Sequence, residues 1–224
     1  MSTDPLLREA PGIGDGPDVD LLLAALVAER EGQQRLMSGD TRGGRRFMRA
    51  AAAAYLASFP LAQPRSWGRL IGAVKAAVLA GDGAPEASHA RIALADIADS
   101  PASCYLGALC AVIDGDDATA LRLAPGMREG GPAFDRAADA IEAIAQGNMD
   151  CLSAAIAAIE DDFAARDAHL TGVPIADTAL MLRALADRRA RTERLAPTHA
   201  LISEVASITA TDSHPLKPVA GCSP

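Results

Sequence analysis

Four Gly-Asp or Gly-Asn pairs constrain the fold of this chain more than any other feature of its sequence. They lie at residues 39–40, 81–82, 115–116 and 147–148, so that successive pairs are 42, 34 and 32 residues apart. An apolar stretch with helical periodicity precedes each pair, and the pair itself supplies a polar residue that can cap a following helix. This spacing predicts antiparallel helical hairpins stacked side by side, as in tetratricopeptide-like repeats, with an irregular helical bundle as the alternative.

The amino-acid composition predicts an all-α fold. Half of the 224 residues are hydrophobic, yet aromatic residues make up only 3%. Ala and Leu dominate and are strong helix formers, whereas the β-branched and aromatic residues that strands prefer are scarce. We expect a single helical domain over residues 18–209. A flexible lead rich in Pro, Gly and Asp precedes it at 1–17, and a disordered proline-rich tail follows at 210–224.

The longest periodic pattern runs from Asn148 to Ala190 and predicts two helices. The apolar residues of the first helix are spaced by four, three and four positions, which is typical of an amphipathic stripe: Leu152, Ile156, Ile159 and Phe163. Thr171-Gly172 is expected to end this helix and Pro174 to start the next, whose inward residues are Ile175, Ala179, Leu182 and Leu185. Similarly, Pro64 is expected in the first turn of a helix, and Ser100-Pro101 to open another.

Charge and hydropathy exclude two classes of partner. The formal net charge is −8, which argues against nucleic-acid binding through phosphate contacts because that requires a basic surface. An acidic protein of this kind can instead bind a basic protein partner. The longest apolar run, around Tyr55, is too short to span a membrane and contains Pro60. The first residues lack the pattern of a signal peptide, so we predict a cytoplasmic protein.

A group of arginines is the first candidate binding site. Arg42, Arg45, Arg46 and Arg49 follow the i, i+3, i+4 rule and therefore share one side of a predicted helix. Such a cluster can bind a phosphate group or an acidic partner. A solvated helix face without a partner is the alternative interpretation.

A second candidate group consists of Glu160, Asp161 and His169 near the predicted end of a helix. A histidine flanked by carboxylates can act as a general base or bind a metal. The spacing, however, spreads these side chains around the helix, so contact with a partner is the better hypothesis. The chain also lacks the common nucleophile, phosphate-loop, dinucleotide and zinc motifs. We therefore assign no catalytic, cofactor-binding or metal-binding residue and expect no enzyme.

Three segments resemble the immunity protein 49 family of polymorphic-toxin antidotes, which is common in actinobacteria. They are SPASCYLGALCAVIDGDDATALRLA, AAIAAIEDDFAARDAHL and TGVPIADTALMLRALADRRA, and the resemblance covers about residues 64–190. It implies a helical, repeat-like protein that binds and neutralises a partner toxin without catalysis. No active-site residue is implied.

Three hypotheses about function remain open from the sequence. The first is an immunity-type protein that neutralises a cognate toxin, and the second is a generic helical-repeat scaffold or regulatory protein. The third is a small helical enzyme, which would need a deep pocket around His169 with Arg42 or Arg46 converging on it.

Overall fold

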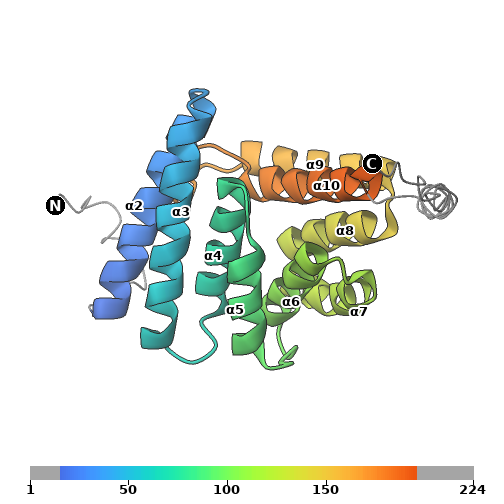
Figure 1. Ribbon diagram of the computed structural model, residues 1–224, viewed down its shortest axis with the longest axis horizontal. Coiled ribbons are helices and arrows are strands. Elements are labelled where there is room, and N and C mark those ends of the chain that lie inside the picture. The colour runs from blue at the N-terminus through green and yellow to red at the C-terminus, as the bar shows by residue number, and fades with distance from the viewer. Residues whose placement is uncertain (1–15, 196–224) are drawn as a thin grey trace, which may run out of the picture. The chain divides into compact units, whose positions relative to one another are not determined.

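The protein is built from helices joined by short connections (Figure 1). The computed structural model describes residues 16–195, with side chains described through residue 191. Within these residues there is no strand and there are nine α-helices: α2 (Pro17–Met37), α3 (Thr41–Ser58), α4 (Trp67–Ala80), α5 (Ala84–Leu94), α6 (Pro101–Asp114), α7 (Asp117–Met127), α8 (Pro132–Gln146), α9 (Met149–Ala164) and α10 (Asp177–Leu195). Two short 3₁₀ helices, η1 (Phe59–Leu61) and η2 (Arg128–Gly130), follow α3 and α7. The predicted all-α class is confirmed.

The chain divides into compact units at residues 1–187 and 188–224. Every site considered below belongs to the first unit. The predicted lead lies outside the described residues except for Gly16 and Pro17, and the predicted tail at 210–224 lies outside them entirely.

The Gly-Asp and Gly-Asn pairs end one helix and lead into the next, as predicted. All four glycines have a positive φ, between 66° and 111°. In each pair the second residue donates its N–H to the carbonyl five positions earlier, at 2.8 to 3.1 Å, which is the bond pattern of the Schellman motif. Asp40, Asp116 and Asn148 then accept the N–H of the third following residue and cap the next helix. At these three turns one dipeptide both ends a helix and caps the next, whereas the N-cap of α5 is Gly83 and not Asp82 as predicted.

Consecutive helices pack against each other in chain order, from α2 through α9, and α4 with α6 and α6 with α8 add contacts between non-consecutive helices. Figure 1 shows α2, α3, α4 and α5 side by side, whereas α8 and α9 run across their direction. Within residues 16–187 the chain is therefore an all-α helical bundle of stacked hairpins.

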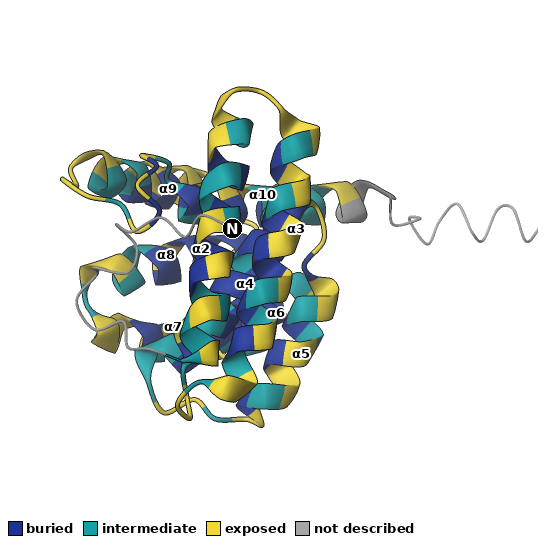
Figure 2. Ribbon diagram, turned by 90° about the vertical axis from the view of Figure 1, so that its left-hand side faces the viewer, coloured by how far each residue is buried: buried dark blue, intermediate teal, exposed yellow. Residues whose placement is uncertain are grey.

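Helix α4 lies at the centre of this packing and is buried on more than one side. Its alanines Ala73, Ala76, Ala77 and Ala80 join a small cluster with α2 and α3, while Leu70, Val74 and Val78 belong to the larger core shared with α5 to α10. Figure 2 shows its buried residues behind α2 and α3. Small residues allow this close approach: a Cβ added at Gly72 would come within 3.0 Å of the Tyr55 ring.

Two predicted helix starts are wrong. Helix α4 begins at Trp67 and does not include Pro64, because Arg65 has a φ of 67°, a left-handed conformation that a helix cannot contain. Helix α10 begins at Asp177 and not at Pro174, because the N–H groups of Ile175 and Asp177 bond to carbonyls two residues back, in tight turns that are not helical. Ile175 consequently lies outside the helix and is only partly buried.

Helix α9 ends at Ala164, well before the predicted stop at Thr171-Gly172. The segment 165–176 is irregular, and it places Thr171 and Val173 in the interior. The predicted stripe of α9 is confirmed, with Leu152, Ile156 and Ile159 buried and Phe163 partly buried.

Candidate functional site

The predicted arginine cluster forms one continuous exposed surface on α3, which we call the arginine face (Arg42, Arg45, Arg46 and Arg49). All four side chains line the same shallow hollow, whose volume is about 600 Å³. Its floor consists of small residues: Ala50 and Ala53 of α3 and Ala80 of α4. The side-by-side placement inferred from their spacing is therefore confirmed.

The opposite side of α3 explains why the arginines face outward. Gly44, Met48, Ala51, Ala52 and Tyr55 are buried at helical spacing. Asp40 caps the helix by accepting the N–H of Gly43 at 2.9 Å, and this bond, together with one from Arg35, lowers the pKa of the Asp40 carboxyl. Cap and buried stripe fix the start and rotation of α3, so the arginines can only point away from the core.

The arginine face carries charge that the described residues do not neutralise. Within residues 16–191 none of the four guanidinium groups has a carboxylate within ion-pair distance. Most other exposed arginines do have such partners, among them Arg65, Arg91, Arg128 and Arg183. Arg122 and Arg191 are exposed and have none among the described residues, but they do not lie in a cluster of arginines in the sequence. At one end, Arg49 also borders a smaller hollow that Asp82 and Glu86 line. The face is thus a cationic surface on a chain whose net charge is −8.

The second predicted group does not join the first. Glu160 is paired with Arg183 at 2.8 Å on the surface, and Asp161 is exposed. His169 lies in the irregular segment after α9, and not near the end of a helix as predicted, because α9 stops at Ala164. Its ring stacks on Phe163 with centroids 6.1 Å apart, and its buried Nδ1 has no hydrogen-bond partner among the described residues. Arg42 and Arg46 line the hollow of α3, and His169 does not.

A buried polar cluster, which the sequence interpretation missed, connects α2, α3, α4 and α10. The Lys75 Nζ of α4 lies 3.0 Å from Glu29 Oε1 and 2.6 Å from Asp177 Oδ2. The Tyr55 hydroxyl donates to Glu29 Oε2 at 2.6 Å, and Gln33 Nε2 donates to Asp177 at 2.9 Å. Two carboxylates therefore share one ammonium group, and each receives a further neutral donor.

This cluster extends into the irregular segment after α9. The Thr171 hydroxyl donates to Gln33 Oε1, so a residue of that segment is bound to α2. Thr171, Gln33, Glu29 and Asp177 are all buried. Because unpaired buried polar groups are costly, these bonds fix the position of Thr171 against α2.

The electrostatics of the cluster indicate a structural role. Burial by itself lowers the pKa of Lys75, but the Glu29 and Asp177 carboxylates outweigh it, so the pKa is raised. Burial and the neighbouring Glu29 charge likewise raise the pKa of Tyr55. A lysine held protonated is neither a base nor a nucleophile. In the sequence, the buried cluster is indicated by a lone lysine inside the otherwise apolar run IGAVKAAVLA.

The described residues show no group of three or more His, Cys, Asp or Glu side chains that could hold a metal ion. None of the described helices combines the length and the apolar character that crossing a membrane requires.

The fold and these sites define an all-α protein with an exposed cationic face and a buried ionic cluster. Comparison with known proteins adds no family to this description: no family model matches the chain, and no curated protein or solved structure matches it either.

Proposed function

We propose that this chain is a non-catalytic binding protein and that the arginine face is its contact surface for an acidic protein. The observation that carries the proposal is that four neighbouring exposed arginines all lack carboxylate partners, whereas most exposed arginines elsewhere in the described residues have them. Like charges so close together repel one another, and an acidic partner relieves that repulsion.

The geometry of the face favours a protein segment as the occupant. Arg42, Arg45, Arg46 and Arg49 extend over two turns of α3, so they match carboxylates presented along a helix or an extended strand. The alanine floor leaves room for the partner backbone to approach closely. Arginine is also the cation best suited to such interfaces, because its planar guanidinium forms paired bonds with a carboxylate.

The finer part of the proposal is that the partner is a toxin, which the chain neutralises by covering it. This rests on the resemblance of about residues 64–190 to the immunity protein 49 family. The arginine face, on α3, lies outside these residues and supplies the contact chemistry. A generic helical scaffold is the second candidate, and it would bind a partner without protecting a cell.

The cytoplasm is the proposed compartment. Cys104, Cys110 and Cys151 are free thiols, which is typical of proteins that stay in a reducing environment.

Capture of partners from nuclease-treated lysate of the source cell tests the proposal. Three baits are compared: the native chain, a face variant with Arg→Gln at 42, 45, 46 and 49, and a control variant with Arg→Gln at 65, 91, 128 and 183. The control removes equal charge from exposed arginines that already hold carboxylates. We expect an acidic protein to be retained by the native and control chains and lost from the face variant.

Co-expression then tests whether the captured protein is a toxin that this chain neutralises. Expression of the captured protein alone should arrest growth, and the native chain but not the face variant should restore it. Capture of no acidic protein, or equal loss from both variants, would contradict the binding proposal. Binding without growth arrest would support the arginine face as the contact surface. It would reject the proposal that the partner is a toxin, and it would favour the helical scaffold.

A further inference from the structure

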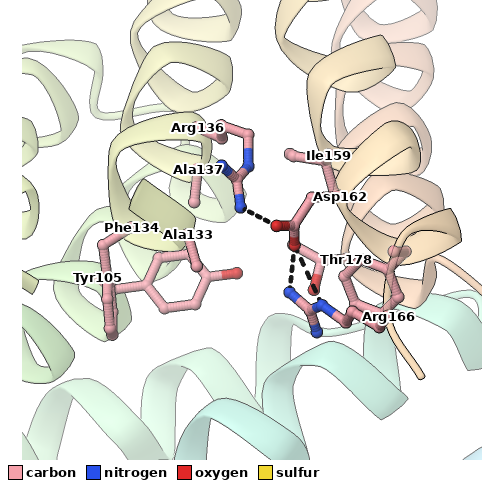
Figure 3. Close-up of a pocket in the computed structure, with 10 residues that line it drawn as sticks. Tyr105, Ala133, Phe134, Arg136, Ala137, Ile159, Asp162, Arg166 and Thr178 are labelled. Carbon is pink, nitrogen blue, oxygen red and sulfur yellow. Dashed lines mark hydrogen bonds and ion pairs between the residues drawn. The ribbon is translucent and has the colours of Figure 1, made fainter. Parts of the chain in front are cut away.

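A cavity of about 170 Å³ lies where α6, α8, α9 and α10 meet, away from the arginine face. Tyr105 of α6 and Phe134 of α8 form one wall, with their rings edge to face and their centroids 5.8 Å apart. Ile159 and Phe163 of α9 add further apolar surface. Figure 3 shows the polar side of the cavity opposite Tyr105 and Phe134, where Asp162 holds two arginines.

The two arginines are fixed in place by one carboxylate. Arg136 reaches from α8 to Asp162 of α9 with an N–O distance of 2.6 Å, and Arg166 contacts the other oxygen of Asp162 through two nitrogens (Figure 3). The Arg166 bond, with help from Arg136, lowers the pKa of Asp162, so this carboxylate stays ionised at neutral pH. Arg166 also lies over the Phe163 ring, 4.1 Å from its centroid. Both guanidinium groups are therefore preorganised before any ligand arrives.

Hydrogen-bond donors outnumber acceptors in this cavity. Two guanidinium groups carry more N–H donors than one carboxylate can accept, and both Asp162 oxygens are already engaged. The local charge of Arg136, Arg166 and Asp162 is positive. The cavity is thus complementary to a ligand that carries hydrogen-bond acceptors and a negative charge.

The Tyr105 hydroxyl adds a further hydrogen-bond donor to this cavity. Tyr105 is 8% exposed, lines the cavity, and has no hydrogen-bond partner for its hydroxyl among the described residues. Figure 3 shows this hydroxyl pointing into the space between the aromatic wall and the arginines. Burial raises the pKa of Tyr105, opposed by Lys75 and reinforced by Asp177, so the hydroxyl keeps its proton and can donate.

We propose that this cavity binds a small aromatic monocarboxylate, with its ring against Phe134 and Phe163 and its carboxylate bonded by the Tyr105 hydroxyl and the free guanidinium donors. The size fits, since an apolar cavity of about 150 Å³ is known to hold benzene and the carboxylate would lie at the open, polar side. The site is separate from the arginine face and does not depend on a protein partner.

Titration of the purified chain with benzoate, followed by calorimetry, tests the site. Benzyl alcohol, which has the ring without the charge, should bind at least about 10-fold more weakly, because it loses the charge-assisted bonds. Tyr105→Phe should weaken benzoate by about 10-fold, since it removes one hydrogen bond to a charged group. Its fold should be unaffected, because the hydroxyl has no protein partner to lose.

Two alanine variants complete the test. Ala133→Leu should abolish benzoate binding, because Ala133 is an exposed residue that lines the cavity, so that the added atoms extend over it. Ala157→Leu makes the same change at an exposed position of α9 outside the cavity and should bind as the native chain does. Failure of benzoate to bind the native chain at millimolar concentration, or binding that Tyr105→Phe and Ala133→Leu leave unchanged, would overturn the proposal. Equal affinity for benzyl alcohol would also overturn it.

Discussion

Lys75 connects α4 to α2 and α10 through two ion pairs. It is mostly buried, with 17% of its side chain accessible, and it neutralises carboxylates from α2 and α10. A buried ion pair adds little net stability over a well-packed apolar pair, but removing one member leaves the other charged and unpaired. At Lys75 that penalty would be felt by two carboxylates at once.

Lys75→Met should therefore destabilise the protein by about 3–5 kcal/mol at pH 7, because Glu29 and Asp177 lose their cation while the side-chain length is kept. Urea unfolding followed by circular dichroism at pH 7 measures this loss.

Arg183→Met is the matched control for this prediction. It breaks the pair with Glu160, whose two side chains are 54% and 43% exposed, and such surface pairs contribute less than about 1 kcal/mol. A loss for Lys75→Met no larger than that for the control would show that the cluster does not stabilise the fold.

At the scale of the element, the Gly-Asp and Gly-Asn turns determine how the hairpins are made. The glycine permits the left-handed residue that ends one helix, and at three of the four turns the Asp or Asn side chain caps the next helix. At these three turns both requirements are met within two adjacent residues, so the turns leave little freedom in how the two helices meet.

Two Gly→Ala substitutions should have different effects on the free energy of unfolding. Gly147→Ala should destabilise by about 1 kcal/mol, because Gly147 has a φ of 66° and an alanine is strained there. Gly68→Ala should be neutral or stabilise by up to about 1 kcal/mol, because Gly68 is helical and a Cβ there would meet no neighbour within 4 Å. Thermal unfolding of both variants measures this difference, and stabilisation by Gly147→Ala would contradict the role of the turn.

The sequence predicts some helix ends better than others. The ends that depend on neighbouring residues can be predicted, whereas those that depend on distant contacts cannot. The helix ends at the four glycines and the Ser100 cap depend on neighbouring residues and were predicted correctly, but at residues 81–82 the expected cap is wrong, since the N-cap of α5 is Gly83 and not Asp82. The end of α9 and the start of α10 depend on burial of Thr171 and Val173 and on the bond from Thr171 to Gln33. Gln33 and Thr171 are 138 residues apart in the chain, so no local pattern could indicate that contact.

At the scale of the whole molecule, the sites also differ in whether they depend on a local sequence pattern or on contacts between distant segments. The arginine face follows from periodicity within one helix, so spacing alone predicts that its four members lie together. The cluster around Lys75 and the cavity beside Tyr105 require knowing which helices meet, because Lys75 and Asp177 are 102 residues apart. A lone lysine within an apolar helix was the one available signal, and it does not identify its partners.

An acidic molecule with one cationic face has a defined electrostatic orientation towards partners. The net charge of −8 repels an acidic protein at long range, while the arginine face attracts it at short range. Binding there should therefore be selective for a partner shaped to approach α3 and should depend on the arginines rather than on net charge.

The most direct test of this account is the dissociation constant of the captured acidic partner for the purified native chain, the face variant and the control variant in 150 mM salt. We predict that the face variant binds about 10- to 100-fold more weakly, since four charge-assisted contacts are lost, and that the control variant stays within about threefold of the native chain. Equal weakening of the two variants would show that only net charge matters and would contradict the arginine face as the binding site.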